Sequence, residues 1–348
     1  MEQVWEGLMH TKSLLPLFLI SVMVLPSMLW GQNTYIPDDN FEQALIDLGY
    51  DDTLDDYVLT ANISGVYELD VANKEISDLT GIEDFTSLIF LECSGNQLYN
   101  LDVSNNTSLV DLRCYSNDSL YSLDVSNNTS LRILDCRANG LSTLDLSYNT
   151  LLENLACSQN YLTSLDLSNN PVLIELNFYQ NNLTSIDLSN NTILDRLACE
   201  LNNLTTLDLS NNTNLTELTC YNNQLFHLNM KNGVTDQLST FNATGNSLDC
   251  IEVDEEDVDW ATENWTYENG NIDEGVEFSV VCAPEGYTYI PDNNFEQALI
   301  DLEYDDVLND FVLTENISGV TILFVGSKSI SDLTGIEDFT ALTELYCY

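Results

Sequence analysis

Basic side chains are scarce in this sequence. The 348 residues include 8 lysine and arginine residues against 57 aspartate and glutamate residues, a formal net charge of −49. A surface this acidic repels the phosphate groups of DNA, RNA and anionic lipid, which argues against nucleic-acid partners and electrostatic docking on a membrane. Histidine is rarer still, with two residues. This scarcity argues against most histidine-dependent catalysis and against histidine-rich metal sites.

Catalytic motifs are missing as well. The sequence contains no nucleophile elbow, no phosphate-binding loop and no histidine-based metal motif. Carboxylate pairs alone could support glycoside hydrolysis, but here the carboxylates fall in repeats or at the ends of the repeat array. We therefore expect a protein that is not an enzyme, with no catalytic residues, no cofactor and no metal ligand set.

Residues 1–31 have the features of an export signal. An apolar run from Leu14 to Leu25 follows Lys12 and is too short to span a bilayer. The small residue Gly31 suits a cleavage site, and no later stretch is apolar enough to span a membrane. The pattern predicts a secreted or cell-surface protein.

The dominant feature is a repeat of 21 residues. Each copy reads L-x-x-L-x-C-x-x-N-x-L-x-x-L-D-[LV]-S-x-N, as in LENLACSQNYLTSLDLSNN over Leu152–Asn170. The alternation L-x-L or L-x-C points the outer two side chains to one side and the middle one to the other, which is strand geometry. A variant coil over Val66–Ser87 precedes seven copies, which begin at Leu88, Leu109, Leu131, Leu152, Leu173, Leu194 and Leu215.

Coils of this kind must stack. A single coil cannot bury its own apolar side, whereas stacked coils share one continuous core. The asparagine three residues after each L-x-C suits a turn, where its amide can bond the backbone of a neighbouring coil. The pattern therefore predicts a solenoid of about eight coils, about 38 Å long at the usual spacing of parallel strands.

These coils resemble bacterial leucine-rich repeats of the internalin-like, irregular 21-residue kind, in which each repeat contains a nested L-x-x-L-D-L half. The stretch DLTGIEDFTSL over Asp78–Leu88 is similar to internalin-type repeats too. The resemblance covers about Val66 to Gly233 and starts again at Val320. It implies an α/β leucine-rich-repeat solenoid with parallel strands on its inner face, and an exported or surface-bound bacterial recognition protein.

Caps are expected at both ends of the solenoid, which we assign to residues 66–233. Residues 34–65 contain PDDNFEQALIDLG, where Asp38 or Asp39 can begin an amphipathic helix that covers the exposed end of the core. We assign this segment to an N-terminal helical cap. Residues 234–282 depart from the 21-residue pattern and are assigned to a C-terminal cap.

The nine cysteines fall into two groups. Cys250 and Cys282 lie outside the repeat register, and in an exported protein we expect them to form a disulfide. The others share one repeat position whose side chain should point into the core, where cysteine behaves as a small hydrophobe. We expect buried free thiols there, with bridges between stacked neighbours as the alternative. These residues are Cys93, Cys114, Cys136, Cys157, Cys199, Cys220 and Cys347, and Phe178 replaces cysteine in one coil.

The end of the chain repeats its beginning. Thr34–Cys93 and Thr288–Cys347 align without a gap, and 16 of the 60 positions differ. We assign residues 283–287 to a linker and residues 288–348 to a second copy of the N-terminal cap with the start of a second array. Because this copy stops as its first cysteine-bearing coil begins, we expect the chain to be a fragment of a longer protein.

The inner face is our candidate ligand-binding surface. Residues between and after the apolar anchors of L-x-x-L-x-C vary from coil to coil, unlike the rest of the repeat. Arginine and tyrosine, the types that dominate binding hot spots, gather there. The candidates are Glu92, Arg113, Tyr115, Arg132, Asp135, Arg137, Asn177, Tyr179, Arg196 and Tyr221.

The opposite half of each coil carries an outward row of aspartates: Asp102, Asp124, Asp145, Asp166, Asp187 and Asp208. Such neighbours repel each other, so Ca²⁺ bridging is one interpretation. We favour solvated aspartates that bond local serine, asparagine and backbone groups. The same choice applies to the acidic cluster at residues 51–56.

Three binding functions remain open. The first is protein binding or adhesion through the inner face. The second is glycan recognition by exposed tyrosine, asparagine and aspartate side chains of that face. The third is a calcium-bridged structural spacer. We expect a protein ligand first.

Overall fold

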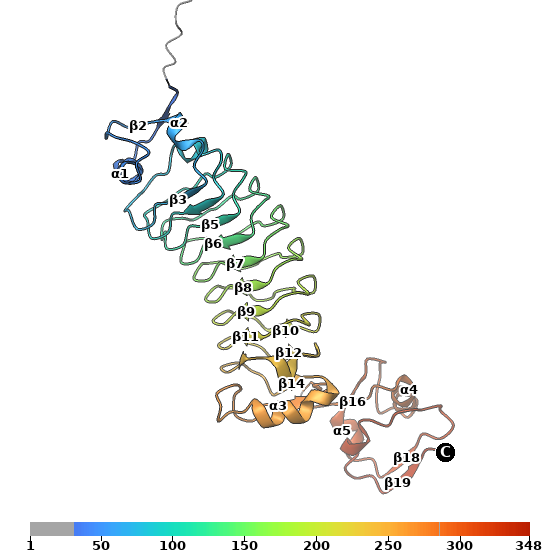
Figure 1. Ribbon diagram of the computed structural model, residues 1–348. Helices are drawn as coiled ribbons and strands as arrows, with labels where there is room; N and C mark the ends of the chain where they lie inside the picture. Colours follow the sequence, from blue (N-terminus) through green and yellow to red (C-terminus); the bar gives the residue numbers. More distant parts are fainter. Residues whose placement is uncertain (1–30, 285) are drawn as a thin grey trace, which may run out of the picture.

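The structure is a computed structural model that describes residues 31–284 and 286–348. The chain builds an elongated solenoid of stacked coils with a small helical unit at each end (Figure 1). The predicted export signal, residues 1–31, lies outside the described residues apart from Gly31. Within the described part of the chain, no helix is long and apolar enough to cross a membrane.

One parallel sheet of nine strands runs along the solenoid and forms its inner face. Each coil contributes a three-residue strand, and neighbours pair in register so that Leu112 lies between Leu91 and Leu134. This is the leucine-rich-repeat solenoid that the sequence predicts. In sheet order the strands are β3 (Glu68–Asp70), β4 (Phe90–Glu92), β5 (Asp111–Arg113), β6 (Ile133–Asp135), β7 (Asn154–Ala156), β8 (Glu175–Asn177), β9 (Arg196–Ala198), β11 (Glu217–Thr219) and β13 (Thr240–Asn242).

The sheet includes one coil that the 21-residue spacing does not reveal. Strand β13 pairs in parallel with β11, within the segment 234–282 that was predicted to belong entirely to the C-terminal cap. In this coil Phe241 and Ala243 replace the leucine and the cysteine, and both are buried. The distance from Cys220 to Ala243 is 23 residues rather than 21, which hides the coil from a search at fixed period.

The opposite side of the solenoid is built mostly from turns. A four-stranded parallel sheet forms there only near the C-terminal end, from β10 (Thr206–Asp208), β12 (His227–Asn229), β14 (Cys250–Glu252) and β15 (Glu277–Ser279). Earlier in the array an isolated bridge joins Asp102 and Asp124. The inner sheet is therefore the long regular surface of the molecule.

A continuous apolar core fills the coils. The repeat leucines are buried along the array, and the cysteine position points inward as predicted. Burial raises the pKa of the ladder thiols, to about 12 for Cys157 and Cys220. These thiols therefore stay protonated at neutral pH and react slowly. The buried free cysteines are Cys93, Cys114, Cys136, Cys157, Cys199 and Cys220, with Phe178 equally buried in the remaining coil.

Thiol labelling should separate the buried ladder from the single exposed cysteine. Cys347 is exposed and unpaired, so native residues 32–348 should show one rapidly reacting thiol with an aromatic disulfide reagent. All seven free cysteines should react in denaturant, and the variant Cys347→Ser should be silent in the native state. Rapid native reaction of a second thiol would contradict the buried ladder.

Two ladders of asparagines link neighbouring coils. In the first, Nδ2 of Asn160 donates to the carbonyl oxygen of Cys157 in its own coil at 3.1 Å and to that of Cys136 in the preceding coil at 3.0 Å. Its Oδ1 accepts from the N–H of Leu141 at 3.0 Å. The ladder thus pairs backbone groups that stacked turns would otherwise bury without partners. Its members are Asn96, Asn117, Asn139, Asn160, Asn181, Asn202, Asn223 and Asn246.

The second ladder uses the last asparagine of each repeat. Nδ2 of Asn170 donates to the carbonyl oxygens of Leu146 at 3.2 Å and Asn149 at 2.9 Å. The Oδ1 atoms of this ladder have no hydrogen-bond partner among the described residues, so it acts through its N–H groups. Its fully buried members are Asn106, Asn128, Asn149, Asn170, Asn191 and Asn212.

The N-terminal cap consists of the antiparallel pair β1 (Asn33–Tyr35) and β2 (Tyr57–Leu59) with the helices α1 (Asp39–Asp47) and α2 (Thr60–Ile63). Asp38 is the N-cap of α1, and its Oδ1 accepts from the N–H groups of Asn40 and Phe41 at 3.0 Å each. The ring of Phe41 stacks on that of Phe85, with centroids 6.4 Å apart. The helix thereby covers the first end of the core.

The C-terminal cap closes the other end with aromatic rings. The helix α3 (Val258–Asn264) precedes Trp265, whose ring stacks on Phe241 of the last coil with centroids 3.9 Å apart. Trp260 meets Trp265 edge-on at 5.6 Å. Cys250 and Cys282 form the expected disulfide, with Cα atoms 5.6 Å apart.

The second copy has its own small core around Phe295 and Leu299. Its elements are β16 (Tyr287–Tyr289), α4 (Asn293–Asp301), β17 (Phe311–Leu313), α5 (Thr314–Ile317), β18 (Ile322–Phe324) and β19 (Glu344–Tyr346). Cys347 does not point into a closed core, contrary to the expectation from its repeat position. The reason is that the coil with β5 covers Cys93 in the first copy, whereas Tyr348 is the last described residue of the second.

Candidate functional site

Three columns of side chains run along the inner sheet. The middle residue of each strand is buried and its two neighbours lie on the solvent side, so the in-register pairing stacks like positions. The column after the leucine holds Glu92, Arg113, Asp135 and Asn177, and a column two residues further holds Tyr115, Arg137, Tyr179 and Tyr221. The predicted residues therefore share one continuous face.

Most of the column before the leucine was absent from the predicted site. Of its members only Arg196 was singled out, and Arg132 lies one position earlier, directly before β6. Strand alternation places both neighbours of a leucine on the same side, so the pattern contained this information. The full column is Glu68, Phe90, Asp111, Ile133, Asn154, Glu175, Arg196, Glu217 and Thr240.

Two arginines of this face pair with aspartates two residues earlier in the chain. Nη2 of Arg113 lies 2.8 Å from Oδ2 of Asp111, and Nη2 of Arg137 lies 2.6 Å from Oδ2 of Asp135. These hydrogen bonds raise the pKa of both guanidinium groups. Each of these arginines is therefore held in place by an aspartate, whose negative charge offsets the positive charge of the guanidinium group.

The other two arginines pair across coils. Arg132 contacts Glu153 of the next coil, and Arg196 contacts Glu175 of the preceding one. Stacking on aromatic rings further restrains the first pair of arginines, because Arg113 lies over the ring of Phe90 and Arg137 over that of Tyr115, each 5.3 Å from the centroid.

A hollow of about 450 Å³ opens in the middle of this face. It lies over β7, where Ala156 and Ser158 are small and the preceding coil has Asp135 and Arg137 at the same positions. The small side chains form a floor between taller neighbours. The hollow is lined by Arg113, Tyr115, Ile133, Leu134, Asp135, Arg137, Asn154, Leu155, Ala156, Glu175 and Asn177.

Half of the predicted site residues come together at the hollow. Arg113, Tyr115, Asp135, Arg137 and Asn177 line it. The other candidates lie on the same face outside it, and they are Glu92, Arg132, Tyr179, Arg196 and Tyr221.

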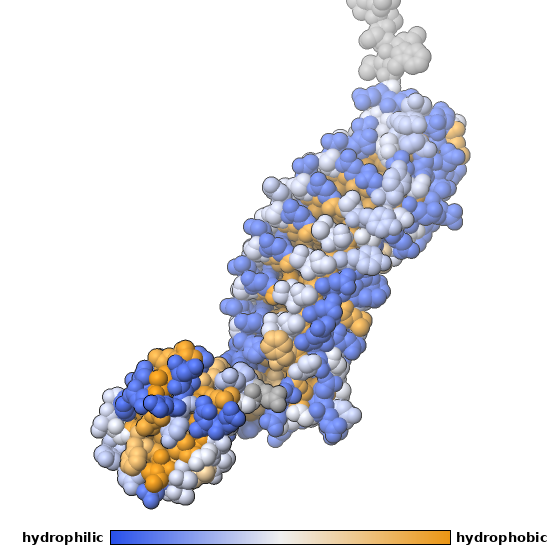
Figure 2. All heavy atoms as spheres, turned by 180° about the vertical axis from the view of Figure 1, so that it is seen from behind, coloured by the Kyte–Doolittle hydropathy of each residue, from blue (hydrophilic) through white to orange (hydrophobic). Residues whose placement is uncertain are grey.

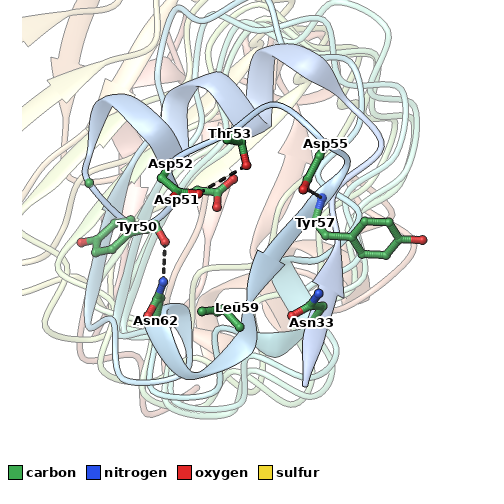
Figure 3. A pocket seen from close by; sticks show the side chains of 10 residues that line it. Asn33, Tyr50, Asp51, Asp52, Thr53, Asp55, Tyr57, Leu59 and Asn62 are labelled. Carbon is green, nitrogen blue, oxygen red and sulfur yellow. Dashed lines mark hydrogen bonds between the residues drawn. The ribbon is translucent and has the colours of Figure 1, made fainter. Parts of the chain in front are cut away.

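A second pocket, of about 330 Å³, lies in the N-terminal cap between the loop after α1 and strand β2 (Figure 3). It contains the acidic cluster of Asp51, Asp52 and Asp55. Burial raises the pKa of Asp51, and its Oδ2 is buried without a hydrogen-bond partner, as is Oδ2 of the equivalent Asp305. Within the described residues, no group of three or more histidine, cysteine, aspartate or glutamate side chains is arranged to hold a metal ion.

The outward aspartates of the opposite side bond to their own turns. Oδ1 of Asp166 accepts from the N–H of Ser168 at 3.0 Å, and hydrogen bonds from this serine lower the pKa of Asp166. The remaining five aspartates of the row repeat the bond. This is the local bonding that the favoured interpretation of the row predicts.

No protein-family model matches the chain. Internalin J of Listeria monocytogenes serotype 4b (strain F2365) is 37% identical over 75 residues, which are 22% of this chain and only 8% of that protein. Among solved structures, an internalin (inlF) from Listeria monocytogenes str. 4b F2365 has a TM-score of 0.53 at 19% identity, covering 90% of this chain and 89% of that one. The functional domain of InlJ from Listeria monocytogenes, which includes a cysteine ladder, has a TM-score of 0.40 at 26% identity, covering 64% and 68%.

Proposed function

Because the chain is an internalin-like leucine-rich-repeat protein, we propose that it is a non-enzymatic protein-binding module, secreted or displayed on a cell surface. The ligand binds the inner face of the solenoid, and a side chain or loop of the ligand enters the hollow over β7. The hollow itself is the observation that carries this proposal.

The walls of the hollow are preorganised. Arg137 is held by Asp135 and by the ring of Tyr115, and Arg113 is held by Asp111. Side chains that are already ordered lose little conformational entropy on binding, and buried arginine and tyrosine anchors dominate interface energies. The hollow thus combines the residue types and the rigidity that protein recognition uses.

The chemistry of the hollow favours binding over catalysis. Its titratable groups are acids, Tyr115 and two arginines, and the arginines are paired. In the described part of the chain the one histidine, His227, lies at the C-terminal end of the array, 3.6 Å from Glu252. No general base of ordinary pKa near neutrality therefore faces the hollow.

Filling the hollow tests the proposal. Ala156→Trp should occupy it, whereas Ala198→Trp adds the same bulk in the same column two coils away, outside the hollow. Both variants and the parent, as residues 32–348, are probed against a panel of purified extracellular proteins. A ligand bound by the parent should bind Ala156→Trp at least about tenfold more weakly, a loss of about 1.4 kcal/mol, and Ala198→Trp within about twofold.

Equal binding by the parent and Ala156→Trp would contradict a role of the hollow. Thermal unfolding of the three proteins serves as the control, since a loss of binding counts only if Ala156→Trp remains folded. If both variants bound the ligand equally weakly, the binding site would lie elsewhere on the inner face and not at β7.

A further inference from the structure

One edge of the solenoid, apart from the inner face, carries unusually open aromatic rings. Tyr99, Tyr121 and Tyr161 are 62%, 65% and 63% exposed. Tyrosine normally buries most of its ring and keeps only the hydroxyl group near water. Three open rings within four successive coils therefore form a surface feature that the packing of the solenoid does not explain.

Repeat register places the first two rings side by side along the array. Tyr99 and Tyr121 each precede an aspartate of the outward row by three residues, and the backbones of these aspartates, Asp102 and Asp124, form a parallel bridge. The two tyrosines thus occupy the same position in adjacent coils.

Gly140, in the coil after Tyr121, connects this pair of tyrosines with Tyr161. A Cβ atom at this glycine would lie 2.5 Å from Cδ1 and 2.7 Å from Cε1 of Tyr121, so the ring lies directly on the glycine backbone. One coil further, Tyr161 occupies the position of Gly140, and its N–H donates to the carbonyl oxygen of Leu141 at 2.8 Å. The row spans three coil spacings, about 14 Å.

The surroundings of the rings are polar. Asn100, Ser122, Ser142 and Thr163 are exposed near the tyrosines, and the aspartate row follows along one side. Each of these aspartates uses Oδ1 for its own serine, which leaves Oδ2 as an outward acceptor. Open rings beside carboxylate acceptors match a ligand with apolar faces and many hydroxyl donors.

We propose that the edge formed by Tyr99, Tyr121 and Tyr161 binds a neutral glycan chain. Its sugar rings stack on the tyrosines, and its hydroxyl groups donate to Asp102 and Asp124. Acidic glycans are repelled by the carboxylate row and by the net charge of −49. This surface is separate from the inner-face hollow and does not depend on it.

Affinity gel electrophoresis tests the proposal with defined polymers. The probes are hydroxyethyl cellulose, xylan and galactomannan as neutral polymers and alginate as an anionic one, with residues 32–348 as the protein. At least one neutral polymer should retard the parent. Tyr121→Ala should weaken this binding about fivefold or more, and Gly140→Ala should do so too, because the added Cβ displaces the ring while the tyrosine remains.

Two controls locate the effect. Tyr148→Ala removes a tyrosine of similar exposure, 60%, from a different repeat position and should leave retardation unchanged. Ala156→Trp, which fills the inner-face hollow, should leave it unchanged as well. The proposal is overturned if no neutral polymer retards the folded parent, if alginate retards it equally, or if either control variant loses binding as Tyr121→Ala does. The test of the hollow uses protein ligands, so either proposal can fail alone.

Discussion

Replacing Asn181 with alanine should lower the free energy of unfolding by about 3 to 5 kcal/mol. Nδ2 of Asn181 donates to the carbonyl oxygens of Cys157 and Phe178 at 3.0 Å each, and its Oδ1 accepts from the N–H of Leu162 at 3.0 Å. Alanine removes these three buried hydrogen bonds. It also leaves the N–H of Leu162 without a partner, and a buried donor without a partner costs about 1 to 3 kcal/mol. Urea unfolding followed by far-UV circular dichroism measures the change.

The next residue provides a matched control. Asn182 is exposed and forms no side-chain hydrogen bond among the described residues, so Asn182→Ala should change stability by no more than about 0.5 kcal/mol. If both variants lost the same amount of stability, general helix or turn propensity, and not the asparagine ladder, would account for the destabilisation. A stability loss below about 1 kcal/mol for Asn181→Ala would contradict the ladder's role in joining coils.

The second large effect concerns the disulfide of the C-terminal cap. Cys250 and Cys282 are 32 residues apart in the sequence, and closing a loop of this length stabilises a fold by about 3 to 4 kcal/mol. The double variant Cys250→Ser/Cys282→Ser should therefore unfold its cap well before the rest of the solenoid. Trp260 and Trp265 are the only tryptophans after residue 31, so tryptophan fluorescence reports on the cap alone.

Comparison of two probes makes this prediction specific. In the parent, fluorescence and far-UV circular dichroism should change together in urea, whereas in the double variant the fluorescence transition should come at a lower concentration. Cys347→Ser removes an exposed, unpaired thiol and should leave both transitions in place. Coincident transitions in the double variant would show that the disulfide does not hold the cap separately.

The fold was predictable because the same 21-residue pattern occurs many times in the sequence. Each L-x-C of the repeat gave a strand of the inner sheet or of the second copy, every cysteine of that position except Cys347 gave a buried thiol, and the stacking followed from the apolar side that a single coil cannot cover. The prediction was incomplete at the coil with β13, where a longer turn, Phe241 and Ala243 altered spacing and composition at once. Packing tolerates such a coil, since only the inward residues must fit.

The candidate site was predictable as a face but not as a cavity. Strand alternation placed Arg113 and Asp135 on the same side, yet the hollow depends on the small floor at Ala156 as much as on its walls. A search for conspicuous residues passes over alanine. In the same way Gly140 gave no signal by itself, because its role depends on where the ring of Tyr121 lies in three dimensions.

The asparagine ladders also bear on how such arrays evolve. The side-chain amide of Asn160 bonds to its own coil and to the preceding one. A coil gained or lost by recombination within the gene would therefore need to match only its two new neighbours. The length of the solenoid can thus change in evolution by about 5 Å per coil without any change in the caps. The segments Thr34–Cys93 and Thr288–Cys347, which are identical at 44 of 60 positions, are a duplication at the level of a whole cap.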